Sequence, residues 1–199
     1  MTRLHLAKRL GERELASLYE ALFLQSVVAF ELMIEDIFLG LVTGQIIHQR
    51  PAKPLVTFPN LPAARKIVMR DRYLNWLPYE NLKKISEIYF VPDKNPFSGC
   101  PIPHTQEMRK AYLIRNYIAH KSEYARHIFE TEVVSPILLH PRQKNLLGYF
   151  RFIHSKKVNK FEYHIGELLN AARWFCMEDQ SAQALSPSEK SQMVSETNE

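Results

Sequence analysis

The chain places three polar residues within six positions, Arg115, Asn116 and His120. These are residue types that chemistry on a phosphate needs. A guanidinium group presents a planar fork of N–H donors that fits phosphate oxygens. An imidazole is the side chain best suited to take up and release protons near neutral pH. Held near one another, these groups predict chemistry on a phosphodiester.

The spacing of these residues has a clear consequence on a helix, where each residue turns by about 100°. Asn116 and His120 are four residues apart, so they stack on one face. Two tyrosines extend this face into a polar ladder of Tyr112, Asn116, His120 and Tyr124. Arg115 projects about 140° away from His120, so only its long side chain lets it reach the same ligand. Lys121 adds a second cation beside the histidine.

An ordinary solvent-facing helix of a basic protein is the competing interpretation of the same residues. In that case Asn116 bonds to the backbone or caps a turn, and His120 is a surface histidine or a satisfied core one. Spacing by itself does not separate the two interpretations, because an arginine and a histidine at this distance also occur by chance.

The stretch Leu-Ile-Arg-Asn-Tyr-Ile-Ala-His-Lys at 113–121 resembles the signature of HEPN domains (higher eukaryotes and prokaryotes nucleotide-binding). That signature is an arginine, a polar residue, a short spacer and a histidine, often with a small residue before the histidine. HEPN domains are all-α bundles of about this size, with a long apolar helix early and the motif in a later helix. The resemblance covers residues 12–178 in architecture and about ten residues in specific sequence.

The resemblance implies a metal-independent endoribonuclease of the toxin or defence type that acts as a homodimer without a cofactor. Arg115 and His120 match the catalytic pair of the family, and Asn116 matches its polar residue. RNA is then the substrate, and an antitoxin or a regulatory protein is a further partner. This chain departs from some HEPN toxins, which carry a tyrosine two residues after the histidine, where Ser122 stands here.

The chemistry of RNA cleavage also favours a dimer. Cleavage without a metal needs a base for the 2′-hydroxyl proton, an acid for the leaving 5′-oxygen, and a cation for the charged phosphorane. One motif supplies one histidine and one arginine. A two-fold dimer places the same helix against itself and brings two of each to a shared cleft. There we expect His120 to act as acid or base, Arg115 to stabilise the phosphate, and Asn116 to orient the phosphate or the histidine.

The sequence leaves two alternatives to an active ribonuclease. The first is a non-catalytic HEPN module that binds nucleotide, RNA or a partner protein. Catalytically silent members typically lose one residue of the pair, and both Arg115 and His120 are present here, which favours the enzyme. The intact pair also disfavours the second alternative, in which the chain is itself the partner protein of a toxin.

The elements that must position these residues are helices, and the patterning predicts an all-α, HEPN-like bundle of about five to six of them. We expect one domain over residues 1–179 and a disordered tail over 180–199, which is rich in serine, glutamine and glutamate. Proline clusters predict loops at 49–61 and 91–104. The character of 144–153, a short helix or a strand, is undecided. The expected helices cover 12–43, 63–70, 78–89, 105–130 and 160–178. Thr105 is the expected N-cap of the helix over 105–130.

Glu31 stands in the most apolar part of the first helix, residues 22–34. Charges within and after this run disfavour a membrane span and favour the centre of a bundle. A buried carboxylate needs a partner. In the functional interpretation Glu31 pairs with Arg115 or His120 and orients it. In the structural interpretation, the commoner fate of such a group, it faces a polar seam or pairs with one of Arg70, Arg72 and Lys110.

Composition limits the remaining classes of function. The formal net charge is +5, and the body without residues 181–199 carries +7, which favours anionic partners such as RNA. The chain has two cysteines, too few for a disulfide framework. The histidines do not fall at metal-ligand spacing, so we expect no metal. With no secretory signal pattern at the N-terminus, we expect a cytoplasmic protein.

Overall fold

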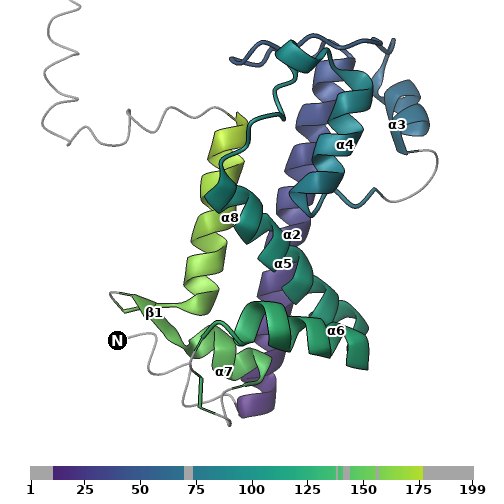
Figure 1. The fold of residues 1–199 in the computed structure, drawn as a ribbon. Helices are drawn as coiled ribbons and strands as arrows, with labels where there is room; N and C mark the ends of the chain where they lie inside the picture. Colours follow the sequence, from purple (N-terminus) through teal and green to yellow (C-terminus); the bar gives the residue numbers. More distant parts are fainter. Residues whose placement is uncertain (1–10, 70–73, 138, 141–143, 156, 177–199) are drawn as a thin grey trace, which may run out of the picture.

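The computed structural model describes residues 11–69, 74–137, 139–140, 144–155 and 157–176. The predicted all-α class is confirmed, with seven α-helices in these residues rather than five to six (Figure 1). They are α2 (Glu12–Val42), α3 (Leu61–Met69), α4 (Tyr79–Tyr89), α5 (Ile102–His120), α6 (Glu123–Ile128), α7 (Leu146–Arg151) and α8 (Lys160–Cys176). The 3₁₀ turn η1 (Pro92–Lys94) and the π-helical turn η2 (Phe129–Val134) join them, and β1 (Ile153–Ser155) pairs antiparallel with β2 (Val158–Asn159).

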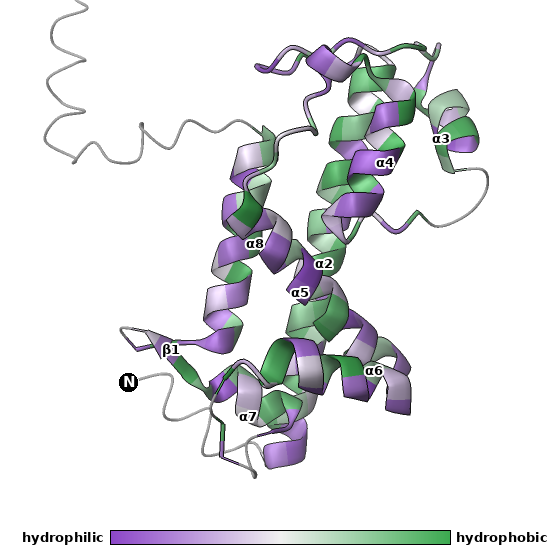
Figure 2. Cartoon of the chain, in the orientation of Figure 1, coloured by the Kyte–Doolittle hydropathy of each residue, from purple (hydrophilic) through white to green (hydrophobic). Residues whose placement is uncertain are grey.

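The long helix α2 is the axis of the bundle, and α5 and α8 pack along it (Figures 1 and 2). It starts where the Glu14 carboxylate accepts a hydrogen bond from the backbone N–H of Gly11 at 2.7 Å. Its buried face carries large apolar side chains at helical spacing, among them Phe23, Val27, Phe30, Ile34 and Phe38. The prediction of a buried bundle helix over 12–43 is confirmed to within one residue, and no helix in the described residues is both long and apolar enough to cross a membrane.

The end of α2 is set by two glycines. Gly44 adopts φ +70°, a left-handed conformation that other residues adopt at a cost. Gly40 has a different role, because the chain after the helix folds back over it. A Cβ at position 40 would lie 2.3 Å from Cδ1 of Ile46. The close approach of this loop to the helix therefore requires glycine.

The motif helix α5 differs from the prediction at both ends. It begins at Ile102 with Pro103 in its first turn, where a missing N–H costs nothing, so Thr105 is inside the helix and is not its cap. It ends at His120 rather than continuing to 130. Lys121 adopts φ 47°, and the Ser122 hydroxyl accepts a hydrogen bond from Ala125 N at 3.1 Å to start α6. The Ser122 cap offers the backbone a turn that competes with continued helix.

The remaining predictions are partly confirmed. The helices expected at 63–70, 78–89 and 160–178 are present as α3, α4 and α8. Wherever the expected end of a helix lies in the described residues, the observed end falls within two residues of it. The undecided segment 144–153 contains α7 and the first residue of β1. The loop expected at 91–104 contains η1 and is shortened by the early start of α5. The predicted tail, 180–199, lies outside the described residues.

Candidate functional site

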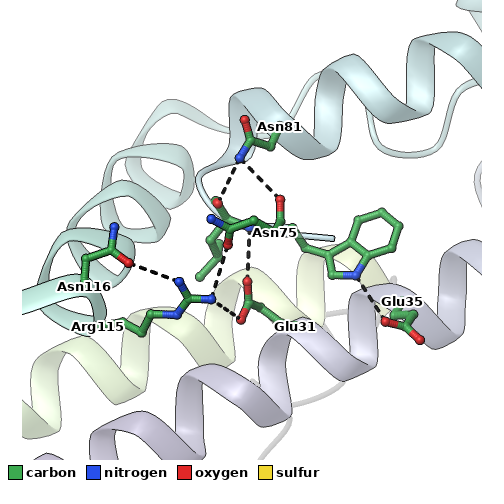
Figure 3. Close-up of polar contacts among 8 residues, drawn as sticks. Glu31, Glu35, Asn75, Asn81, Arg115 and Asn116 are labelled. Atoms are coloured by element: carbon green, nitrogen blue, oxygen red, sulfur yellow. Dashed lines mark hydrogen bonds and ion pairs between the residues drawn. The ribbon is translucent and has the colours of Figure 1, made fainter. Parts of the chain in front are cut away.

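Arg115 points from α5 toward the middle of α2 (Figure 3). Its Nη2 lies 3.4 Å from Oε2 of Glu31, and its Nη1 donates to Oδ1 of the neighbouring Asn116 at 3.1 Å. The Arg115 side chain is 18% exposed and that of Glu31 is 3% exposed. An ion pair with so little water around it is screened weakly. The guanidinium is therefore held in one direction.

The loop before α4 completes the surroundings of this ion pair. Oδ1 of Asn75 lies 3.4 Å from Nη2 of Arg115. With the amide turned over, Nδ2 of Asn75 instead donates to Oε1 of Glu31 at 3.1 Å and to the Leu77 carbonyl at 3.0 Å. The backbone N–H of Leu77 donates to the same Glu31 oxygen at 3.4 Å. Glu31 thus joins α2, α5 and this loop. Of the two interpretations of Glu31 that the sequence allows, the pairing with Arg115 agrees with this geometry.

Asn116 and His120 line a pocket of about 350 Å³ on the outer face of α5. The whole predicted ladder meets here, although Tyr124 comes from α6 and not from the motif helix. His120 is exposed, and its ring makes no hydrogen bond within the described part of the chain. The lining residues are Arg109, Tyr112, Leu113, Asn116, His120, Ser122, Tyr124, Ala125, Ile128 and Glu132.

Arg115 and His120 do not meet within one copy of the chain. Arg115 is absent from the pocket lining and is bound toward α2, whereas His120 lies at the exposed end of α5. Asn116 connects them, because it accepts a hydrogen bond from Arg115 and also lines the pocket. This separation follows from the angle of about 140° between positions 115 and 120 on a helix.

Lys121 turns away from the pocket. Its left-handed backbone directs Nζ to Oε2 of Glu20 on α2, at 3.2 Å, and it lines a different, smaller hollow together with Tyr117 and Arg126. The ammonium group of Lys121 therefore faces Glu20, between α2 and the end of α5, and Lys121 is absent from the lining of the pocket beside His120.

Among the residues of the site that the sequence analysis did not select are two charged residues, Arg109 and Glu132, and the amide Asn75. Arg109 stands seven residues before Asn116, so the helical arithmetic that found the ladder would also have included it. Glu132 belongs to η2 and binds Arg109 across the pocket, with Nη2 and Oε2 at 2.7 Å. Asn75 stands in a loop, where no periodic pattern marks it.

The opposite face of α5 is fixed by a buried polar network. His164 on α8 bonds through Nδ1 to Oε2 of Glu107 at 3.0 Å and through Nε2 to the Tyr149 hydroxyl at 2.7 Å, and Lys110 binds the other Glu107 oxygen at 2.6 Å. Burial raises the pKa of Glu107, but hydrogen bonds and charges from His164 and Lys110 outweigh it and lower that pKa to about 2. Burial lowers the pKa of His164. The network holds α5 in register against α7 and α8.

No protein-family model, curated protein or solved structure matches the chain. Within the described residues, no group of three or more histidine, cysteine, aspartate and glutamate side chains is arranged to hold a metal ion.

Proposed function

We propose that this protein is an endoribonuclease of the toxin or defence type that cleaves RNA without a metal, through Arg115, Asn116 and His120 at a homodimer interface. The observation that carries the proposal is the pocket beside His120, which Asn116 also lines. Arg115 does not line the pocket itself but donates a hydrogen bond to Oδ1 of Asn116. The resemblance of residues 113–121 to the HEPN signature supports the same assignment.

The proposed reaction is a transesterification within the RNA strand. One imidazole takes the proton of a ribose 2′-hydroxyl, and the 2′-oxygen attacks the adjacent phosphorus. The bond from phosphorus to the 5′-oxygen breaks, and the second imidazole gives that oxygen a proton. The products are a 2′,3′-cyclic phosphate and a free 5′-hydroxyl. The guanidinium stabilises the charge on the phosphorane between these steps.

The direction in which two copies meet decides whether this site can form. The exposed apolar residues Leu18 and Leu22 lie about 140° and 180° around α2 from Glu31, the residue that contacts the motif helix. A dimer through these leucines would leave the two His120 side chains on outer faces. The proposal therefore requires contact through the ends of α5 and through α6.

The test is cleavage of labelled single-stranded RNA, with a chelator present, by the wild-type protein and two histidine variants. His120→Ala should reduce the rate at least about 100-fold, as expected for loss of a general acid or base. His154→Ala removes an exposed histidine of β1, which lies outside α5, α6 and the pocket lining, so it is the matched control and should retain the rate. Equal rates for wild type and His120→Ala would remove the mechanism.

A non-catalytic module that binds nucleotide, RNA or a partner protein is the second candidate. The specific observation in its favour is that Glu31 and Asn116 hold Arg115 away from the pocket. Expression in cells separates the two. A ribonuclease arrests growth and His120→Ala relieves the arrest, whereas a binding module leaves growth unaffected in both forms.

A further inference from the structure

We propose that the pocket beside His120 binds one unstacked base of the RNA, with guanine preferred, and so sets the cleavage specificity. This inference rests on the proposed ribonuclease function. The pocket volume of about 350 Å³ falls at the small end of the range of about 300–1,000 Å³ that is typical of small-ligand sites. Its lining combines aromatic rings, a few aliphatic side chains and a single ion pair.

The aromatic side chains give the pocket its affinity for a flat ring. Tyr112 on α5 and Tyr124 on α6 both line it, and Tyr124 is 75% exposed. An exposed tyrosine next to a pocket offers a face on which a base can stack, and proteins bind single-stranded RNA in this way. The aliphatic Leu113 and Ile128 supply the apolar part of the lining.

The ion pair gives the pocket its selectivity. Nη2 of Arg109 lies 2.7 Å from Oε2 of Glu132, and both side chains are partly exposed. Guanine presents an acceptor, O6, directly beside two donors, N1–H and the N2 amino group. A guanidinium donates to O6 and N7, and a carboxylate accepts from the two donors. Adenine and cytosine each offer one amino donor and uracil one N–H, so guanine satisfies this pair most fully.

The pocket also puts the base where the chemistry needs it. His120 and Asn116 belong to the same lining as Arg109 and Tyr112. A base in this pocket leaves its own ribose and the following phosphate at the opening, within reach of the imidazole. Cleavage is then expected next to guanosine.

The first test is the binding of the four ribonucleoside 5′-monophosphates to the full chain by titration calorimetry. Wild type should bind the guanosine nucleotide about tenfold more tightly than the others, and Glu132→Gln should reduce that preference about tenfold. Glu130→Gln is the matched control, because Glu130 is an exposed carboxylate two residues away that does not line this pocket. Tyr124→Ala should weaken all four nucleotides, whereas Tyr124→Phe should not.

The second test maps cleavage sites on an RNA of mixed sequence. Equal binding of the four nucleotides by wild type, or an unchanged preference in Glu132→Gln, would overturn the guanine pocket. RNA cleavage that depends on His120 but shows no base preference would overturn it while leaving the ribonuclease intact. Selective guanosine binding without any cleavage would support the pocket and remove the proposed ribonuclease function.

Discussion

The guanidinium of Arg115 contacts the carboxylate of Glu31, a residue 84 positions earlier in the chain, at 3.4 Å. This contact ties the motif helix to the central helix. It also directs the arginine away from the pocket that His120 lines. The two residues of the motif thus have different surroundings in one copy of the chain.

Removing the charge of Glu31 should destabilise the fold. Glu31→Gln leaves Arg115 without its counter-ion in a mostly buried place, and we expect the free energy of unfolding to fall by about 2 kcal/mol. This is less than for a fully buried pair, because the arginine is 18% exposed. Urea denaturation measures the change, and Glu31→Gln with Arg115→Gln completes a double-mutant cycle.

The control for this cycle is the more exposed pair between Lys121 and Glu20, whose side chains are 69% and 27% exposed. Glu20→Gln should change the free energy of unfolding by less than about 0.5 kcal/mol, because water screens the charges. Equal losses for the Glu20 and Glu31 variants would show that the Arg115 contact contributes no more than a surface pair.

Mixed dimers test whether the site is shared between two copies. A mixed dimer of the wild-type chain and His120→Ala holds one imidazole, whereas the proposed cleft needs two, one as base and one as acid. Co-expression with two affinity tags should therefore give a mixed dimer that cleaves about 100-fold more slowly than the wild-type dimer. A mixed dimer that keeps about half of the wild-type rate would show that each copy cleaves alone, which contradicts the shared cleft.

Acid should destabilise the protein through Glu107 and His164. The folded-state pKa of Glu107 is lowered from 4.5 to about 2, so its stabilisation is complete above pH 4.5 and is lost as the pH falls toward 2. The folded-state pKa of His164 is lowered from 6.5 by burial, so the unfolded chain binds that proton first below pH 6.5. Glu107 contributes about 3 kcal/mol at neutral pH. Urea denaturation at pH 7, 5 and 3 measures the decline.

The matching variants are Glu107→Gln and Glu87→Gln. The first is less stable at pH 7 and should show a smaller further loss between pH 4.5 and 3, because the titrating carboxylate is gone. The second removes an exposed carboxylate of α4 and should follow the wild-type curve. Parallel curves for wild type and Glu107→Gln would contradict the assignment.

Alanine at position 40 should destabilise the protein, although alanine favours a helix. The added Cβ would lie 2.3 Å from Cδ1 and 3.2 Å from Cβ of Ile46. We expect a loss of about 1–3 kcal/mol, and Ile46→Ala in the same chain should recover part of it. Gly166→Ala in α8 is the control, because an added Cβ there would have no neighbour within 4 Å in the described part of the chain, and it should raise the melting temperature.

The helices could be predicted where the sequence is periodic. The apolar run of α2 and the face of α5 that carries Met108, Ala111, Ile114 and Ile118 are buried as their spacing indicates. The break after His120 could not be predicted from periodicity, because the residues around Lys121 are compatible with a helix. The local competition between the Ser122 cap and continued helix decides it.

The sequence by itself determined the all-α class, the long central helix and the face shared by Tyr112, Asn116 and His120, because these follow from local spacing. Only the tertiary structure decided that Arg115 binds Glu31, that Lys121 turns to Glu20, and that Glu132 enters the pocket. The physical reason is that a helix fixes angles among its own residues. The partner of a charged side chain depends on which helix packs against it, and that is set by burial of the whole core.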